Sequence, residues 1–437
     1  MVLLSGGVAA ADGQIAKDWG FFYSGRLAIK FDMGNGNNDA LTDLIALPDG
    51  QGSIAVGVVN CPSTTDCIGI ARLNFDGSTN YDFGTNGKVV YAPFTPGLKK
   101  IFVSSATLDV FGKLLIAGKY TTQDNASGYF VTRFDMDGNP VNFQANTKNS
   151  VFNKFNNGEI AQAPEIAPLS NGGFFLAGGA YNGNPSIGVM KFKVNGTIDT
   201  VFGGTGKKIY GYPFSSQVIP YAIAVANDKL VIVGEELLNT NQPLNKNAFA
   251  LKIMATTGEP DNDFNSGTVH IALDQGPVGL RDDAARAVVV DPNGDVVIAG
   301  YAQTASNRYK GALVKINSVG DIVFKKYSLG AASSMQFSEL VRQDDGKYVA
   351  AGTRWTDVQQ PALVDIEVDR FSTDGTLDVS FGASGRSILD FFNAGFEVGT
   401  GLAIDSNGHI LIGGYGKMLN GLGNDFMMAA LTLGVIQ

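Results

Sequence analysis

The stretch Asp291-Pro-Asn-Gly-Asp-Val-Val-Ile-Ala-Gly300 decides how this chain folds. It places an Asn-Gly turn before four apolar residues and a closing glycine, which is typical of a short β-strand leaving a tight turn. The pattern occurs seven times, with closing glycines at positions 57, 118, 178, 234, 300, 352 and 414. These glycines stand 52 to 66 residues apart, about 60 on average. Such regular spacing predicts a repeat protein.

A second signature follows the closing glycine in each copy. Its clearest form is Arg370-Phe-Ser-Thr-Asp-Gly375 followed by Phe381-Gly382: a basic and an apolar residue, a glycine turn, and an aromatic residue. Each unit therefore predicts four short strands, named A to D: A before the first turn, B up to the closing glycine, C up to the basic residue, and D after the aromatic residue. Four antiparallel strands form one blade of a β-propeller, so seven units predict an all-β, seven-bladed propeller.

The two ends of the chain predict how the ring closes. Residues 12–20 repeat the pattern of residues 374–382, so the chain starts inside a repeat and supplies a D strand at residues 25–32. The last expected strand, residues 426–433, is a C strand. We therefore expect the N-terminal strand to complete the last blade, which makes residues 12–437 one propeller and hides strand edges that would otherwise pair with other chains.

The combined pattern Asp-Gly-x-Leu-Asp-x-x-Phe-Gly and x-x-Asp-Gly-x-Ile-x-x-Ala-Gly resembles the delta-60 repeat (DUF5122-type) family, bacterial β-propellers of largely unknown function. The resemblance covers nearly the whole chain and is best at residues 196–206 and 377–385. Copies two and five depart from it at Asn142-Phe143-Gln144 and Val323-Phe324-Lys325, where the glycine after phenylalanine is missing. The turns of those two blades are therefore expected to differ from the others.

Composition excludes two classes of function. The chain has 437 residues, of which 44% are hydrophobic and 56 are glycine, in keeping with a packed β-protein that has many turns. Its net charge of −9 disfavours nucleic acid as a partner, because an acidic surface repels phosphate. The sequence contains no apolar run of about 20 residues, so no membrane span is predicted.

Two features suggest export. Residues 1–11 are apolar and end in small residues, like the tail of a secretory signal, although they lack a basic start; the alternative is a flexible terminus. Cys61 and Cys67 lie in one polar loop, and we expect a disulfide between them, which implies an oxidising compartment; the alternative is two free thiols. The location expected is therefore secreted, periplasmic or at the cell surface.

A search for catalytic motifs finds neither Gly-x-Ser-x-Gly nor His-Glu-x-x-His, and we expect His270 and His409 to be structural. No metal site and no cofactor are predicted. The recurring aspartates of the C–D turns (Asp199, Asp261, Asp378) are expected to be structural as well. The recurring basic residues are expected to pair with acidic or carbonyl groups; they are Arg72, Arg133, Lys191, Lys252, Lys315 and Arg370.

If strand A is innermost, the B–C loops share one face around the channel mouth. They differ in length and composition, and variable loops on a rigid ring commonly carry binding specificity. The candidate ligand-binding residues in them are Tyr120, Tyr181, Glu235, Glu236, Tyr301, Arg354, Trp355 and Tyr415. Aromatic faces stack on the apolar faces of sugars or on peptides. The alternative is that the tyrosines pack between blades.

Two functions follow from this sequence. The first is a binding or scaffold module that recognises a protein or a glycan at the face of the B–C loops. The alternative is a Ca²⁺-dependent hydrolase or lyase of the propeller-lactonase type at the channel mouth, which makes calcium the one cofactor to consider. A cluster of carboxylates at the mouth with strongly raised pKa values or a bound metal would favour the enzyme.

Overall fold

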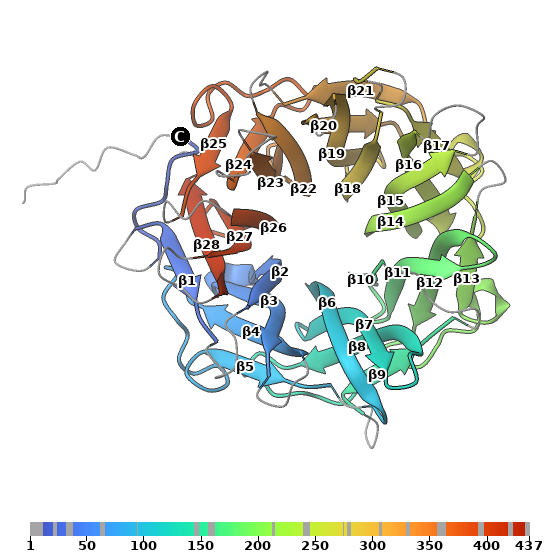
Figure 1. The fold of residues 1–437 in the computed structure, drawn as a ribbon, viewed down its shortest axis with the longest axis horizontal. Helices are drawn as coiled ribbons and strands as arrows, with labels where there is room; N and C mark the ends of the chain where they lie inside the picture. Colours follow the sequence, from blue (N-terminus) through green and yellow to red (C-terminus); the bar gives the residue numbers. More distant parts are fainter. Residues whose placement is uncertain are drawn as a thin grey trace, which may run out of the picture.

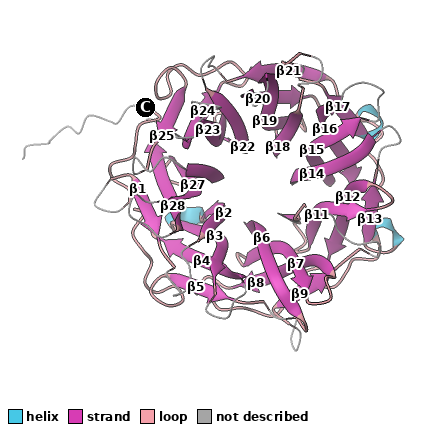
Figure 2. Cartoon of the chain, viewed as in Figure 1, coloured by secondary structure: helices cyan, strands magenta, loops and turns pink. Residues whose placement is uncertain are grey.

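The computed structural model forms a ring of seven four-stranded antiparallel sheets (Figure 1), as the sequence predicts. It describes residues 12–20, 24–31, 38–61, 66–93, 95–143, 148–155, 162–211, 215–238, 245–273, 275–277, 281–305, 308–328, 333–355, 364–391, 397–417 and 423–432. Strands dominate these residues, and helix is confined to single turns (Figure 2): η2 (Pro48–Gly50), η3 (Phe202–Gly204) and η4 (Asn265–Gly267). None of the helices described is long and apolar enough to cross a membrane.

The blades follow the order of the chain, and in each the first strand lies nearest the axis of the ring (Figure 1). Blade 1 contains β2 (Ala40–Ala46), β3 (Ser53–Asn60), β4 (Asp66–Leu73) and β5 (Lys88–Tyr91). Blade 2 contains β6 (Leu98–Leu108), β7 (Leu114–Thr122), β8 (Ser127–Phe134) and β9 (Ser150–Asn153). Blade 3 contains β10 (Glu165–Pro168), β11 (Phe174–Tyr181), β12 (Pro185–Phe192) and β13 (Lys207–Tyr210). Blade 4 contains β14 (Ser215–Ala226), β15 (Lys229–Leu238), β16 (Lys246–Met254) and β17 (Thr268–Ile271). Blade 5 contains β18 (Asp283–Val290), β19 (Val296–Ala305), β20 (Arg308–Ile316) and β21 (Ile322–Tyr327). Blade 6 contains β22 (Ser334–Arg342), β23 (Tyr348–Trp355), β24 (Val364–Phe371) and β25 (Arg386–Leu389). Blade 7 contains β26 (Glu397–Ile404), β27 (His409–Lys417), β28 (Asn424–Thr432) and the N-terminal β1 (Arg26–Ile29).

The N-terminal strand closes the ring. β1 pairs antiparallel with β28, with Arg26 opposite Ala429 and Ile29 opposite Phe426. A further bridge joins Ile15 to Leu431, so the segment before β1 also lies against blade 7. The predicted three-plus-one closure is therefore confirmed, and the last blade gains the outer strand that its own sequence does not supply.

Adjacent blades are joined by an aromatic residue that packs under the C–D-turn glycine of the next blade. The seven pairs are Trp19–Gly77, Phe83–Gly138, Phe143–Gly196, Phe202–Gly258, Phe264–Gly320, Phe324–Gly375 and Phe381–Gly13. In six pairs a Cβ on the glycine would lie only 2.6–3.1 Å from the aromatic ring; Gly320 instead approaches the backbone of Phe264 and Asn265. Only glycine leaves room for this contact, and its positive φ suits the turn.

A backbone hydrogen bond reinforces the same junction in five places. The N–H of the residue after the aromatic donates to a carbonyl of the next blade: Gly20 to Asp76, Gly84 to Asp137, Gly203 to Thr257, Asn265 to Val319 and Gly382 to Asp12, at 2.7–3.0 Å. Blade 5 differs, as its missing glycine suggests: Phe324 lies inside β21, which has six residues where the other D strands have four. Gln144 of blade 2 lies outside the described residues.

The recurring basic residues pair as expected. Lys191 and Arg370 each bind the aspartate of their own C–D turn, at 3.2 Å from Asp199 and 2.9 Å from Asp378. Arg133 and Lys315 bind aspartates of the A–B turns, and Arg72 donates to the carbonyl of Met136 in the next blade. The repeated charges are therefore explained by structure.

Cys61 and Cys67 form the predicted disulfide, with 5.6 Å between their Cα atoms. It lies at the start of the B–C loop of blade 1, where Cys67 is buried. The bond ties β3 to β4 at the loop end of the blade.

The contact between Trp19 and Gly77 can be tested with a matched pair of substitutions. Gly77 and Gly112 both have positive φ, 77° and 68°, but a Cβ on Gly112 has no atom within 4 Å. Both alanine variants bear the backbone cost of roughly 1 kcal/mol, and only Gly77→Ala adds overpacking of about 1–3 kcal/mol. Thermal unfolding should show a clearly lower midpoint for Gly77→Ala than for Gly112→Ala; equal midpoints would show that the contact contributes nothing.

Candidate functional site

The innermost strands contain an extra residue that interrupts their regular pairing. In six blades the A strand has a β-bulge opposite the closing glycine of strand B. There a carbonyl oxygen of the A strand would lie 1.9–2.2 Å from a Cβ on that glycine, so a larger residue is excluded. The extra residues at the bulges are Thr42, Ser104, Tyr221, Arg286, Ser338 and Thr400. Bulges commonly re-aim side chains in this way.

Several of these side chains link one blade to the next around the axis. Ser338 Oγ donates to the Gly399 carbonyl at 2.9 Å, and Thr400 Oγ1 donates to the Leu41 carbonyl at 2.7 Å. Next to a bulge, the carboxylate of Asp43 accepts the N–H of Ala106 in blade 2 at 2.7 Å. The small bulge residues therefore serve the ring itself, which leaves Tyr221 and Arg286 as the exceptions.

Tyr221 and Arg286 join blades 4 and 5 by a different contact. The guanidinium carbon of Arg286 lies 3.9 Å from the centroid of the Tyr221 ring, a close cation–π contact. Burial and the neighbouring carboxylate of Glu235 raise the pKa of Tyr221 to about 12. Glu235 is itself buried and pairs with Lys246 at 3.1 Å. A continuous polar chain therefore runs from Lys246 through Glu235 and Tyr221 to Arg286.

A row of aromatic side chains lies beside this polar chain. Tyr301 packs edge-on against Tyr309 with ring centroids 5.2 Å apart, and Tyr309 packs against Trp355 of blade 6 at 6.1 Å. All three side chains are half-buried. Burial raises the pKa of Tyr301, and Glu235 raises it further, whereas Arg286 opposes the shift; these groups are therefore neighbours. We call the combined set the blade 4–6 site; it consists of Tyr221, Glu235, Lys246, Arg286, Tyr301, Tyr309 and Trp355.

Three carboxyl groups on the innermost strands interact across the ring. Burial raises the pKa of Asp43 to about 6, despite the N–H groups of Ala106 and Leu44 that favour its charged form. Burial raises the pKa values of Glu165 and Glu339 well above their ordinary range, and repulsion from Asp43 adds to both shifts. Arg286 is the cation that opposes these shifts. This axial carboxyl group, Asp43, Glu165 and Glu339, is therefore reluctant to ionise.

These carboxyls do not gather into a metal site. Within the described ranges, no three His, Cys, Asp or Glu side chains come together in a way that could hold a metal ion. Calcium needs six to eight oxygen ligands at roughly 2.3–2.6 Å. The described residues thus offer raised carboxyl pKa values without a cluster of three such side chains.

The structure brings together three of the eight candidate residues named from the sequence, namely Glu235, Tyr301 and Trp355. Glu236 points away from them: it is fully buried, lies 2.6 Å from His270 Nδ1 and accepts from Ser215. Arg354 is held by Asp365 and Glu367 at 3.3 and 3.2 Å. These two residues therefore serve ion pairs in the described structure.

The remaining candidates stand apart on other blades. Tyr120 packs edge-on against Phe152 of its own blade at 5.1 Å. Tyr181 ends β11 and is 44% exposed, and Tyr415 on β27 is half-buried. These three tyrosines lie on β7, β11 and β27 of blades 2, 3 and 7, outside the blade 4–6 site.

Sequence reasoning missed four members of the blade 4–6 site: Tyr221, Lys246, Arg286 and Tyr309. Two of them occupy bulge positions on A strands, where blades 1, 2, 6 and 7 carry serine or threonine. A comparison of the A strands would have found Tyr221 and Arg286 as large residues at a place otherwise filled by small hydroxyl residues.

Comparison with known families supports the resemblance found in the repeats. The family described as "Domain of unknown function (DUF5122) beta-propeller" matches residues 112–140 and 343–381. These two segments are equivalent parts of the repeat in blades 2 and 6. No curated protein sequence matches the chain.

Solved structures with a similar arrangement are distant in sequence. A PL25 polysaccharide lyase, an ulvan lyase bound to -[GlcA(1-4)Rha3S]-, is 10% identical over 97% of this chain and 95% of that chain, with a TM-score of 0.46. Drosophila Semaphorin 1a, extracellular domains 1-2, is 9% identical over 93% and 88%, with a TM-score of 0.45. The β-propeller domain of the Trilobed protease from Pyrococcus furiosus is 9% identical over 90% and 96%, with a TM-score of 0.45.

The axial carboxyl group predicts how stability depends on pH. The folded protein holds the Glu339 proton more tightly than the unfolded chain, whose pKa is near 4.5. Its contribution to stability is therefore full below about pH 4.5 and is lost as the pH rises through the raised value. Glu339→Gln should increase stability at pH 8 and change it little at pH 4.

Unfolding in denaturant at both pH values measures this difference. Glu259→Gln is the control, because the Glu259 side chain is 67% exposed and pairs only at the surface with Lys208. A Glu339→Gln variant that is equally stabilised, or destabilised, at both pH values would show that this carboxyl is not held protonated by the fold.

Proposed function

We propose that this protein is an exported binding module that recognises a glycan or a protein at the blade 4–6 site. One observation carries the proposal: three half-buried aromatic rings lie in a row beside a polar chain whose charges are already paired. Side chains of this kind offer flat apolar faces together with fixed hydrogen-bonding groups. That combination suits sugar rings, and it also suits an extended peptide.

The burial of the site supports binding as its task. Glu235 is held in place by Lys246, and Tyr221 is held between Glu235 and Arg286. Such support fixes side chains before the ligand arrives, which lowers the entropy lost on binding. The disulfide between Cys61 and Cys67 is compatible with an oxidising compartment and supports the export part of the proposal.

A second candidate is a hydrolase or lyase that uses the axial carboxyl group. The raised pKa values of Asp43, Glu165 and Glu339 favour it, because a carboxyl that keeps its proton near neutral pH can act as a general acid. Its calcium-dependent form requires ligands that the described residues do not assemble. Product analysis of any bound glycan after long incubation distinguishes this enzyme from a binding module.

A glycan array, followed by calorimetry on each glycan that binds, tests the binding proposal. Trp355→Ala removes the ring at the end of the aromatic row and should weaken binding about tenfold or more. Tyr181→Ala is the matched control, because Tyr181 is also a loop-end aromatic but lies on blade 3, outside the row. Equal binding by both variants would show that the blade 4–6 site does not bind the glycan. If no glycan on the array binds, the ligand proposed is a protein, and cross-linking tests it.

A further inference from the structure

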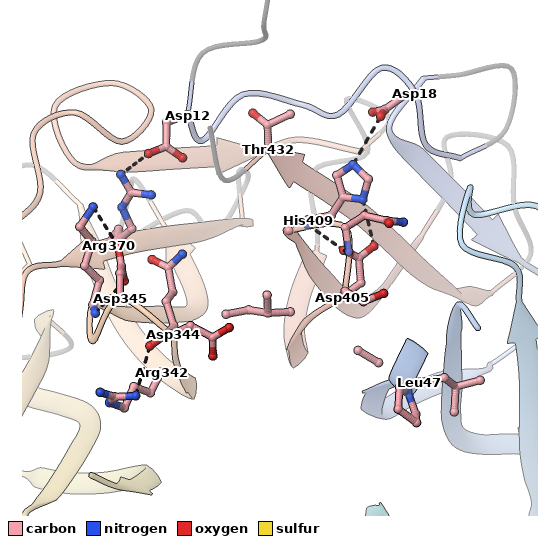
Figure 3. A pocket seen from close by; sticks show the side chains of 18 of the residues that line it. Asp12, Asp18, Leu47, Arg342, Asp344, Asp345, Arg370, Asp405, His409 and Thr432 are labelled. Carbon is pink, nitrogen blue, oxygen red and sulfur yellow. Dashed lines mark hydrogen bonds and ion pairs between the residues drawn. The ribbon is translucent and has the colours of Figure 1, made fainter. Parts of the chain in front are cut away.

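A hollow lies on the face opposite the B–C loops, where the A–B turns of blades 6, 7 and 1 meet (Figure 3). Its volume is about 1600 Å³, larger than the range of roughly 300–1,000 Å³ usual for small-molecule sites. Leu47 and Pro48 of blade 1, Leu108 of blade 2 and Ile404 of blade 7 supply apolar wall. A cavity of this size and length has room for several linked rings.

The N-terminal segment builds one side of the hollow. The Asp12 carboxylate binds Arg370, and the N–H of Gly13 donates to the Thr432 carbonyl at 2.7 Å. Farther along, Asp18 lies 3.5 Å from Nε2 of His409 (Figure 3). The hollow therefore exists only in the closed ring, where both chain ends meet.

The less exposed charges of the wall already have partners. Arg342 is 3.1 Å from Asp291, and Lys347 is 3.3 Å from both Asp345 and Asp378. Asp405 accepts from His409 at 2.9 Å and is bound by the N–H groups of its turn. A ligand charge that reaches these less exposed groups would have to displace one of the pairs, whereas a neutral ligand can use the donors and acceptors that remain free on paired groups.

Gln343 gives independent evidence that the hollow accepts a ligand. It lines the hollow, its side chain is only 7% exposed, and its Oε1 has no hydrogen-bond partner. Blades 2, 5 and 7 carry an aspartate at this repeat position, which binds Arg133, Lys315 and His409. Blade 6 carries an amide at this position instead of the aspartate. A buried polar group is therefore left unsatisfied, and a hydrogen-bond donor on a ligand would remove that energetic cost.

We infer that this hollow is a second binding site, and that it takes a neutral saccharide chain. Sugar hydroxyls supply the donor that Gln343 lacks and can share the lone pairs and N–H groups of the paired charges. The apolar faces of the sugar rings can cover Pro48, Leu108 and Ile404. The inference does not depend on the blade 4–6 site, which lies on the other face.

The test uses purified full chain and a defined probe panel. Neutral probes are hexasaccharides of cellulose, xylan, mannan and laminarin, and charged probes are hexamers of polygalacturonate and chitosan. Ser406→Trp should fill the hollow from an exposed A–B turn and weaken binding of a neutral hexasaccharide at least tenfold. Ser170→Trp is the control, because Ser170 is exposed at the same repeat position in blade 3 and does not line the hollow.

A second variant separates lost binding from lost folding. Gln343→Leu removes the unsatisfied amide, so it should weaken the neutral hexasaccharide about fivefold without lowering the thermal midpoint. Trp355→Ala should leave this binding unchanged, which distinguishes the hollow from the blade 4–6 site. The inference is overturned if no neutral hexasaccharide binds, if binding survives Ser406→Trp, or if a charged hexamer binds more tightly at the hollow.

Discussion

The contact between an aromatic side chain and the turn glycine of the next blade is the interaction on which this ring depends. Each of the seven blades places an aromatic residue at or just after its C–D turn, and in six of them the ring meets the turn glycine of the neighbouring blade. The contact buries a large ring, fixes the spacing between sheets, and in five junctions aligns a backbone hydrogen bond. Trp19 makes this contact for the last junction, so the N-terminal segment contributes both the D strand of blade 7 and the link to blade 1.

A second close contact, between the closing glycine of strand B and the backbone of strand A, shapes the surface around the axis of the ring. The closing glycine of strand B makes room for a bulge in strand A, and the bulge turns one extra side chain toward the axis. At that place Ser338 and Thr400 tie neighbouring blades together. Where it is Tyr221 or Arg286, the same geometry presents an aromatic ring and a cation beside Glu235. The candidate site is therefore a local departure from the motif that holds the ring together.

The fold could be predicted from the sequence because its determinants are local and repeated sevenfold. The positions of Gly300 and Phe381 carry a glycine and an aromatic residue in every unit. The match of residues 12–20 to residues 374–382 predicts the closure. The basic residues could be predicted for the same reason, and the disulfide could be predicted because Cys61 and Cys67 lie in one short loop. The candidate site was predicted only in part. Glu235, Tyr301 and Trp355 were found because loops vary, whereas Arg286 and Tyr221 meet across a blade junction that no local pattern describes. The unsatisfied amide of Gln343 likewise depends on the packing of four blades.

Closure of the ring by the N-terminal strand is the claim most open to direct test. Hydrogen–deuterium exchange followed by mass spectrometry can report residues 26–29 and residues 426–429 as separate peptides. β1 is the edge strand of blade 7, so its N–H groups that face β28 should be protected, while those that face outward exchange quickly. Residues 426–429 should exchange as slowly as β27, and the protected part of residues 26–29 should lose protection in the same unfolding transition. Rapid exchange of residues 26–29 in a protein whose β27 remains protected would contradict the closed ring.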